Sequence, residues 1–200
     1  MQPDLRLYLG KSHSGKTTLA LHQARTARRL LVHDPVGDDR WGLQWTVTSD
    51  RAELLDTLAQ PGAVRCAWRG AFTANSERER LAAFEWANRC AWACGNLTIL
   101  WDELDTFTER GLPPVAYRIV NAGRHRALAV YACSRRPFRV PRDVSANAGR
   151  IICFRMTEPR DVQYLEAIAG DVARQVPQLW RFHALDWTEY GSIVRVAPFD

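Results

Sequence analysis

Lysine is almost absent from this chain. Of its 27 basic side chains 25 are arginines, and the two lysines are Lys11 and Lys16. Long apolar runs are also missing: no stretch of about 18 uncharged apolar residues occurs, and the N-terminus lacks the apolar core of a signal peptide. We therefore expect a protein that neither spans a membrane nor is exported. No linker rich in proline, glycine or serine divides the chain, so we expect a single domain over residues 1–200.

Cysteine is sparse and irregularly placed. The five cysteines follow neither a metal-finger nor a disulfide spacing. Cys90 and Cys94 lie one helical turn apart in a segment rich in alanine and tryptophan. There we expect small buried side chains rather than metal ligands. This use of cysteine indicates a reducing cytoplasm.

Both lysines lie in one stretch of eight residues, Gly10-Lys11-Ser12-His13-Ser14-Gly15-Lys16-Thr17. The stretch fits the phosphate-loop pattern G-x-x-x-x-G-K-[ST] at every fixed position. Its glycines let the backbone N–H groups point toward a phosphate chain, and Lys16 supplies a mobile point charge for the β- and γ-phosphates. Thr17 offers a hydroxyl to the Mg²⁺ that bridges those phosphates. The loop, with Thr18 at its end, is therefore predicted to bind ATP and Mg²⁺.

The flanking segments support this prediction. Leu5–Leu9 alternates like a strand and leads directly into the loop, and Thr17 to Leu30 is predicted to be a helix. That order places the partial positive charge of a helix N-terminus against the phosphates. The alternative is a Gly/Ser turn that fits the pattern by chance, and the flanking strand and helix favour nucleotide binding.

A second segment indicates hydrolysis. Leu97–Trp101 is an apolar run typical of a buried strand, and it ends in Asp102-Glu103, which resembles a Walker B motif. Asp102 would hold Mg²⁺ opposite Thr17, and Glu103 would polarise the attacking water as general base. If it does not, Asp105 is the next acid to consider. In the alternative interpretation, both acids only cap a following helix.

The remaining segments alternate between strands and helices, which predicts an α/β fold, a P-loop NTPase with a mainly parallel central sheet flanked by helices. We expect an antiparallel C-terminal hairpin at the sheet edge, with Gly191 in its turn. The other predicted strands are Leu30–His33, Ala63–Trp68, Ala127–Cys133 and Arg150–Phe154, the helices are Ser76–Ala93 and 158–169, and the hairpin strands are Trp180–Trp187 and Ser192–Ala197.

The order of these features resembles the FtsK/HerA superfamily of DNA-translocating ATPases, and in particular the genome-packaging ATPases of tailless, membrane-containing icosahedral viruses. Four segments carry the resemblance: Gly10–Thr17, His33-Asp34-Pro35 with Trp41 downstream, Leu97–Glu103, and Gly123–Arg126 leading through Ala127–Cys133 to Ser134-Arg135-Arg136-Pro137. It implies an ATP-hydrolysing motor that forms a homo-oligomeric ring, moves double-stranded DNA without sequence preference and packages a viral genome into a preformed capsid. It also implies a capsid vertex, portal or membrane protein as anchor, and a place in the host-cell cytoplasm or at a virion vertex.

The chain departs from the family at one position. Many relatives place a glutamine at the end of the fourth strand to sense the γ-phosphate, and Arg135 occupies this place here. If the alignment slips by one residue, Ser134 is the polar sensor instead. Both assignments are open at this point.

Arginine is concentrated between Gly111 and Arg142, where seven arginines occur and no aspartate or glutamate. Such a cluster could contact DNA phosphates without reading sequence. It could also supply a trans arginine finger to a neighbouring subunit, with Arg124 or Arg126 as candidates, or it could merely solvate a surface. Trp41 and Trp45 are candidates for an adenine contact or a subunit interface.

Two other functions compete with the motor. A small-molecule kinase for nucleosides or nucleotides also pairs a phosphate loop with a short α/β domain, but no lid insertion is evident. A nucleotide-dependent assembly protein would not need Lys16, Thr17, Asp102 and Glu103 together. Stimulation of ATPase activity by DNA would distinguish the motor from both.

Overall fold

The computed structural model describes residues 4–188 and 190–196. Within them, nine strands form one sheet in the order β3-β4-β2-β5-β6-β1-β7-β8-β9. Strands β1 to β7 run parallel, and β8 and β9 add an antiparallel hairpin at one edge. The predicted α/β fold class is therefore confirmed. The strands are β1 (Leu5–Leu9), β2 (Arg29–His33), β3 (Thr46–Thr48), β4 (Val64–Trp68), β5 (Leu97–Trp101), β6 (Leu128–Ser134), β7 (Arg150–Phe154), β8 (His183–Thr188) and β9 (Gly191–Val196).

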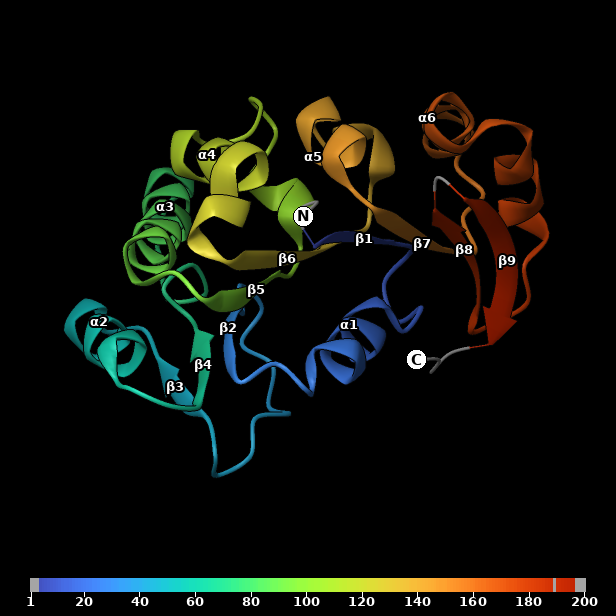
Figure 1. Cartoon of the computed structure of the whole chain (residues 1–200). Coiled ribbons are helices and arrows are strands. Elements are labelled where there is room, and N and C mark those ends of the chain that lie inside the picture. Colours follow the sequence, from blue (N-terminus) through green and yellow to red (C-terminus); the bar gives the residue numbers. More distant parts are fainter. Residues whose placement is uncertain (1–3, 189, 197–200) are drawn as a thin grey trace.

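Helices cover both faces of the sheet, which explains why its central strands are nearly continuous apolar runs. Helix α1 lies on one face, and α3, α4 and α5 lie on the other (Figure 1). The α-helices are α1 (Lys16–Ala24), α2 (Arg51–Ala59), α3 (Glu77–Cys94), α4 (Pro114–Ala122), α5 (Arg142–Asn147) and α6 (Pro159–Ala169). Short 3₁₀ segments are η1 (Leu104–Thr106), η2 (Gly123–Arg126), η3 (Pro137–Arg139) and η4 (Gly170–Gln178). No helix in the described part of the chain is long and apolar enough to cross a membrane.

The alternation of side chains along each strand divides the core in two. Leu7 and Ile99 belong to the larger cluster, which the helices from α2 to α6 cover. Tyr8 and Leu100 point the other way and pack with α1. Strand β5 is anchored further by Trp101, whose indole N–H donates to Asn88 on α3 at 2.9 Å. The strand that carries Asp102 and Glu103 is thus held rigidly at its carboxyl end.

Most of the predicted elements are present, with some changed ends. The strands Leu5–Leu9, Leu97–Trp101 and Arg150–Phe154 have the predicted bounds. The predicted helix Thr17–Leu30 is wrong in length, because α1 ends at Ala24 and a turn is needed before β2 begins at Arg29. The first hairpin strand starts at His183 rather than Trp180, since Phe182 has a left-handed backbone and the His183 N–H donates to the Trp180 carbonyl at 3.0 Å.

Gly191 takes the positive φ expected of the hairpin turn, 148°. Two residues of the predicted hairpin, Glu189 and Ala197, lie outside the described residues. The five cysteines are free thiols, and all except Cys94 are fully buried, as expected of small core side chains.

Candidate nucleotide-binding site

The phosphate loop joins β1 to α1 and has the backbone that phosphate binding requires. Gly10 and Gly15 have φ angles of 156° and 101°, and His13 between them has a φ of 60°. A side chain on Gly10 could not fit, because a Cβ there would lie 2.6 Å from the Ser14 Oγ and 2.8 Å from the Phe154 Cβ. The Ser14 hydroxyl is buried and has no hydrogen-bond partner among the described residues, so the loop leaves a polar atom available for a ligand.

Lys16, at the start of α1, is buried and folds across this loop. Its Nζ donates to the carbonyl oxygen of Lys11 at 3.0 Å. Lys11 itself is exposed and extends outward, where its Nζ donates to the Thr157 Oγ1 at 2.7 Å. Ser12, His13 and Thr18 are exposed on the loop and the first turn of α1. The two lysines therefore point to different places, Lys16 into the loop and Lys11 away from it.

Thr17 and Asp102 meet at the carboxyl end of β5. The Thr17 Oγ1 donates to the Asp102 Oδ1 at 2.9 Å, although the two residues are 85 positions apart. Burial raises the pKa of Asp102, and the bond from Thr17 and the charge of Lys16 oppose that rise. A hydroxyl and a carboxylate side by side are the hard oxygen ligands that Mg²⁺ prefers, so the residues present fit that ion.

Glu103 follows with a left-handed backbone, φ 51° and ψ 42°. Its side chain is mostly buried and forms an ion pair with Arg135. Burial raises the pKa of Glu103, while the positive charge of Arg135 lowers it. Glu103 precedes η1, but its side chain makes no capping hydrogen bond there, which argues against the interpretation that it only caps a helix.

Strand β6 lies between β1 and β5, so its carboxyl end enters the site directly. Ser134 is buried: its hydroxyl donates to the Asp105 Oδ1 at 3.1 Å, and its carbonyl accepts from the Gly10 N–H at 3.2 Å. The Arg135 N–H also donates to the Asp105 Oδ1, at 3.0 Å. The Arg135 side chain, unlike that of Ser134, points to Glu103 and forms an ion pair with it. The geometry thus favours Arg135 over Ser134 as the residue that would read the nucleotide.

Comparison with known proteins bears on the fold. No protein-family model matches the sequence, and no curated protein matches it. Among solved structures, the genome-packaging NTPase B204 of Sulfolobus turreted icosahedral virus 2, in complex with sulfate, matches with a TM-score of 0.74 at 15% identity, over 100% of this chain and 98% of that one.

The fold is similar to that of viral genome-packaging NTPases. B204 from Sulfolobus turreted icosahedral virus, described as a DNA-packaging ATPase, matches with a TM-score of 0.71 at 17% identity, over 98% of this chain and 97% of that one. The pCW3 conjugation coupling protein TcpA matches with a TM-score of 0.54 at 14% identity, over 96% of this chain and 59% of that one. Other structures of B204 from Sulfolobus turreted icosahedral virus 2 contain ATPγS, AMPPCP or AMP. The resemblance expected from the sequence is confirmed at the level of the fold.

The arginine-rich segment does not form one surface. Arg124 and Arg126 precede β6 and therefore lie at the opposite end of this strand from Arg135. Arg126 donates from its Nε to the Trp92 carbonyl at 3.1 Å and from its Nη2 to the Ala93 carbonyl at 2.5 Å, so it caps the end of α3. Within one subunit neither arginine is near the phosphate loop, and a role in trans stays a prediction.

Asp34, at the carboxyl end of β2, organises the loop beside the site, and sequence reasoning gave it no role of its own. Its Oδ1 accepts from the N–H groups of Gly37 and Asp38 at 2.9 and 3.0 Å. Its Oδ2 accepts from the Trp41 Nε1 at 2.9 Å and from the Arg69 Nε at 3.0 Å. The sequence feature that could have indicated this role is an acid directly after a buried strand.

The hydrogen bond to Asp34 fixes the position of Trp41, which also packs on Trp45 with ring centroids 4.7 Å apart. An adenine contact or a subunit interface at these two tryptophans stays a prediction.

We expect Asp34→Ala to lower the free energy of unfolding by about 2–4 kcal/mol, because it removes four hydrogen bonds and leaves Arg69 without its buried partner. Asp39→Asn is the matched control. Asp39 lies in the same loop and 3.9 Å from the Arg69 Nη2, but it is fully exposed, so the expected change is within about 0.5 kcal/mol. Urea unfolding of the two variants tests this, and equal stabilities would show that Asp34 does not hold the loop.

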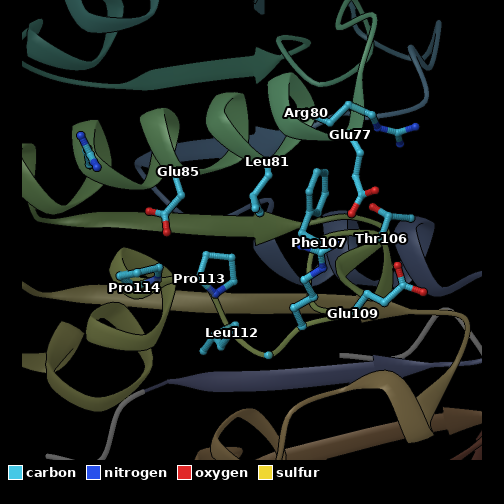
Figure 2. Close-up of a pocket in the computed structure, with 13 residues that line it drawn as sticks. Glu77, Arg80, Leu81, Glu85, Thr106, Phe107, Glu109, Leu112, Pro113 and Pro114 are labelled. Carbon is cyan, nitrogen blue, oxygen red and sulfur yellow. The ribbon is translucent and has the colours of Figure 1, made fainter.

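A cavity lies away from the phosphate loop. It has a volume of about 650 Å³ and lies between α3 and the segment 106–114, with side chains such as Leu81, Glu85 and Pro113 around it (Figure 2). None of the phosphate-loop residues lines it. Cavity size alone would therefore not identify the nucleotide site, which is recognised by its chemistry.

Proposed function

We propose that this chain is an ATPase that moves double-stranded DNA and packages a viral genome into a preformed capsid. The observation that carries the proposal is the convergence of Lys16, Thr17, Asp102 and Glu103 at the carboxyl ends of the central strands β1 and β5. The fold around them is shared with viral genome-packaging NTPases. A protein that only binds nucleotide would not need a mostly buried carboxylate beside the metal-binding pair.

Different residues bind the phosphates, hold the metal ion and activate the attacking water. The loop N–H groups and Lys16 hold the β- and γ-phosphates, and Thr17 and Asp102 hold Mg²⁺, which would supply charge to offset that of the phosphates. Glu103 orients a water molecule and accepts its proton as the water oxygen bonds to the γ-phosphorus and the bond to the β–γ bridging oxygen breaks. Arg135 is placed to stabilise charge on the γ-phosphate when it leaves Glu103.

The proposed partners follow from charge and fold. The chain has a net charge of +5 and a pI of about 9.2, which suits contacts to a polyanion that carry no sequence information. We propose a homo-oligomeric ring around double-stranded DNA, because the phosphate-loop edge of a small domain is open to a neighbour. A capsid-vertex, portal or membrane protein would anchor that ring.

We expect ATP turnover to rise several-fold when duplex DNA is added, and to the same extent for duplexes of unrelated sequence, because phosphate contacts do not read bases. Phosphate release with and without DNA measures this, and stimulation should weaken as salt is raised. Lys16→Ala, purified in parallel, is the control for contaminating ATPases.

The same assay distinguishes the alternatives. A kinase would transfer the γ-phosphate to a nucleoside or nucleotide instead of releasing it, and an assembly protein would bind ATP without turnover. Turnover that DNA leaves unchanged would contradict the motor proposal, as would stimulation by one sequence alone.

A further inference from the structure

A second cleft borders the phosphate loop through Lys11 and Ser12. It has a volume of about 600 Å³, within the range of small-ligand sites. Its lining combines four basic and two acidic side chains with one serine: Lys11, Ser12, Asp105, Arg135, Arg136, Arg139 and Asp161. Neither Lys16 nor Thr17 nor Asp102 lines it, so the cleft is separate from the proposed metal and β-phosphate positions.

The two acids of this cleft are already engaged. Asp105 is buried and accepts the hydrogen bonds from Ser134 and Arg135 described above. Asp161 is also buried: its Oδ1 accepts from the Phe138 N–H at 3.4 Å, and its Oδ2 lies 3.5 Å from the Arg136 Nη1. Both acids therefore hold the segment that carries the arginines.

The basic side chains, in contrast, are accessible. Arg135, Arg136 and Arg139 are 40%, 50% and 46% exposed, and Lys11 is exposed as well. Arg139 makes only weak contacts among the described residues: its Nη2 lies 3.9 Å from the exposed Glu109, and its guanidinium lies 5.9 Å from the centroid of the Phe138 ring. Accessible guanidinium groups converging with an ammonium group are suited to a phosphate, which accepts several charge-assisted hydrogen bonds at once.

Lys11 supports this interpretation through its identity. In a chain whose basic residues are otherwise arginines, only Lys11 and Lys16 are lysines. The Lys11 ammonium donates to the Thr157 Oγ1 at 2.7 Å as a compact point charge, whereas arginine would present a rigid planar fork there. Retention of lysine at both positions indicates that Lys11, like Lys16, has a role that arginine does not fill.

Two of the cleft residues are bonded to catalytic candidates. The Lys11 carbonyl accepts from the Lys16 Nζ, and the Arg135 guanidinium pairs with Glu103. An anion in the cleft would compete with Glu103 for Arg135 and so free Glu103 to contact water, the same release that the proposed contact of Arg135 with the γ-phosphate requires. We propose that this cleft is a second phosphate-binding site, that its ligand is a phosphate group other than those of the bound nucleotide, and that its occupancy controls the availability of Glu103.

The phosphate has two possible sources with the same chemistry, a nucleic-acid backbone and the free phosphate that hydrolysis releases. Only the first source rests on the proposed function. Binding of inorganic phosphate to the ADP-loaded chain tests the cleft without DNA, and DNA-stimulated ATP turnover tests the backbone.

The variants are Arg139→Ala and Arg136→Lys, the second of which retains a charge for Asp161. Arg174→Ala is the control, since Arg174 is 68% exposed and lies outside the cleft. We expect calorimetry to show that Arg139→Ala weakens phosphate binding to the ADP-loaded chain about tenfold, the loss expected for a hydrogen bond between charged groups, while ADP affinity and melting temperature stay at wild-type values.

The outcomes show whether the cleft binds phosphate and which of the two sources supplies it. Loss of DNA stimulation together with phosphate affinity identifies the backbone as the ligand, and loss of phosphate affinity with stimulation unchanged identifies the released phosphate. If both cleft variants bind phosphate and respond to DNA as the Arg174→Ala control does, the proposal is overturned. A wild-type chain that binds phosphate but shows no DNA response would contradict the motor and leave the cleft supported.

Discussion

Glu103→Gln will hydrolyse ATP about 10²–10⁴ times more slowly than the wild-type chain, because the attacking water loses the carboxylate that accepts its proton. ATP affinity will stay near the wild-type value, since the glutamine keeps the size of the side chain and the phosphate loop is untouched. Steady-state turnover and binding of ATPγS, measured on the same preparation, separate the two effects.

Lys16→Ala is the matched comparison, because it should lose both nucleotide affinity and turnover. Near wild-type turnover by Glu103→Gln would remove the role assigned to Glu103. Asp105 would then be the next acid to test, although its Oδ1 already accepts from the Ser134 hydroxyl and the Arg135 N–H.

Activity per subunit will rise steeply with protein concentration if a neighbour completes the site. A trans arginine finger contributes about 10³–10⁵ in rate in other phosphoryl-transfer systems. Mixing Glu103→Gln subunits, which keep their arginines, with Arg124→Ala subunits, which keep Glu103, should therefore restore part of the activity that each lacks alone. Arg124 is a cleaner choice than Arg126, because Arg126 also caps the carbonyls of Trp92 and Ala93 and its loss would weaken the end of α3.

Specific activity that stays constant on dilution would contradict the need for a neighbour. If activity rises with concentration but the mixture shows no rescue, assembly would be supported and the finger would have to be another arginine. The same mixing experiment with each remaining arginine of the segment replaced in turn would identify it: Arg118, Arg126, Arg135, Arg136, Arg139 and Arg142.

The segments that could be predicted from the sequence are those whose chemistry demands particular residue types at fixed spacing. Gly10, Gly15, Lys16 and Thr17 form a local pattern, and the apolar run before Asp102 predicts a buried strand without knowledge of its neighbours. Helices α2, α4 and α5 and strand β3 were not predicted, although α6, which begins at Pro159, was. Helix α4 begins at Pro114 directly after Pro113, and α5 follows Pro141, so both starts resemble turns in the local sequence. Strand β3 has three residues, too few for a period to show.

Contacts that depend on strand order could not be predicted. Arg135 reaches Glu103 because β6 lies between β1 and β5, and nothing in the local sequence indicates that insertion. The seven arginines of the 111–142 segment look like one cluster along the chain. Strand β6 separates them: Arg124 and Arg126 lie just before its first residue, and Arg135 lies just after its last, so they are at opposite ends of the strand.

The left-handed backbone of Glu103 has a consequence for how this chain can evolve. Glycine, and often asparagine, adopts that conformation readily, whereas glutamate is disfavoured there by about 1 kcal/mol. Selection for folding alone would therefore favour replacement of Glu103, whereas the proposed role as general base would require its carboxylate. Descendants that lose the need for ATP turnover should drift toward glycine or asparagine at this position early. The identity of residue 103 would then distinguish working copies from decayed ones even where the rest of the phosphate site is intact.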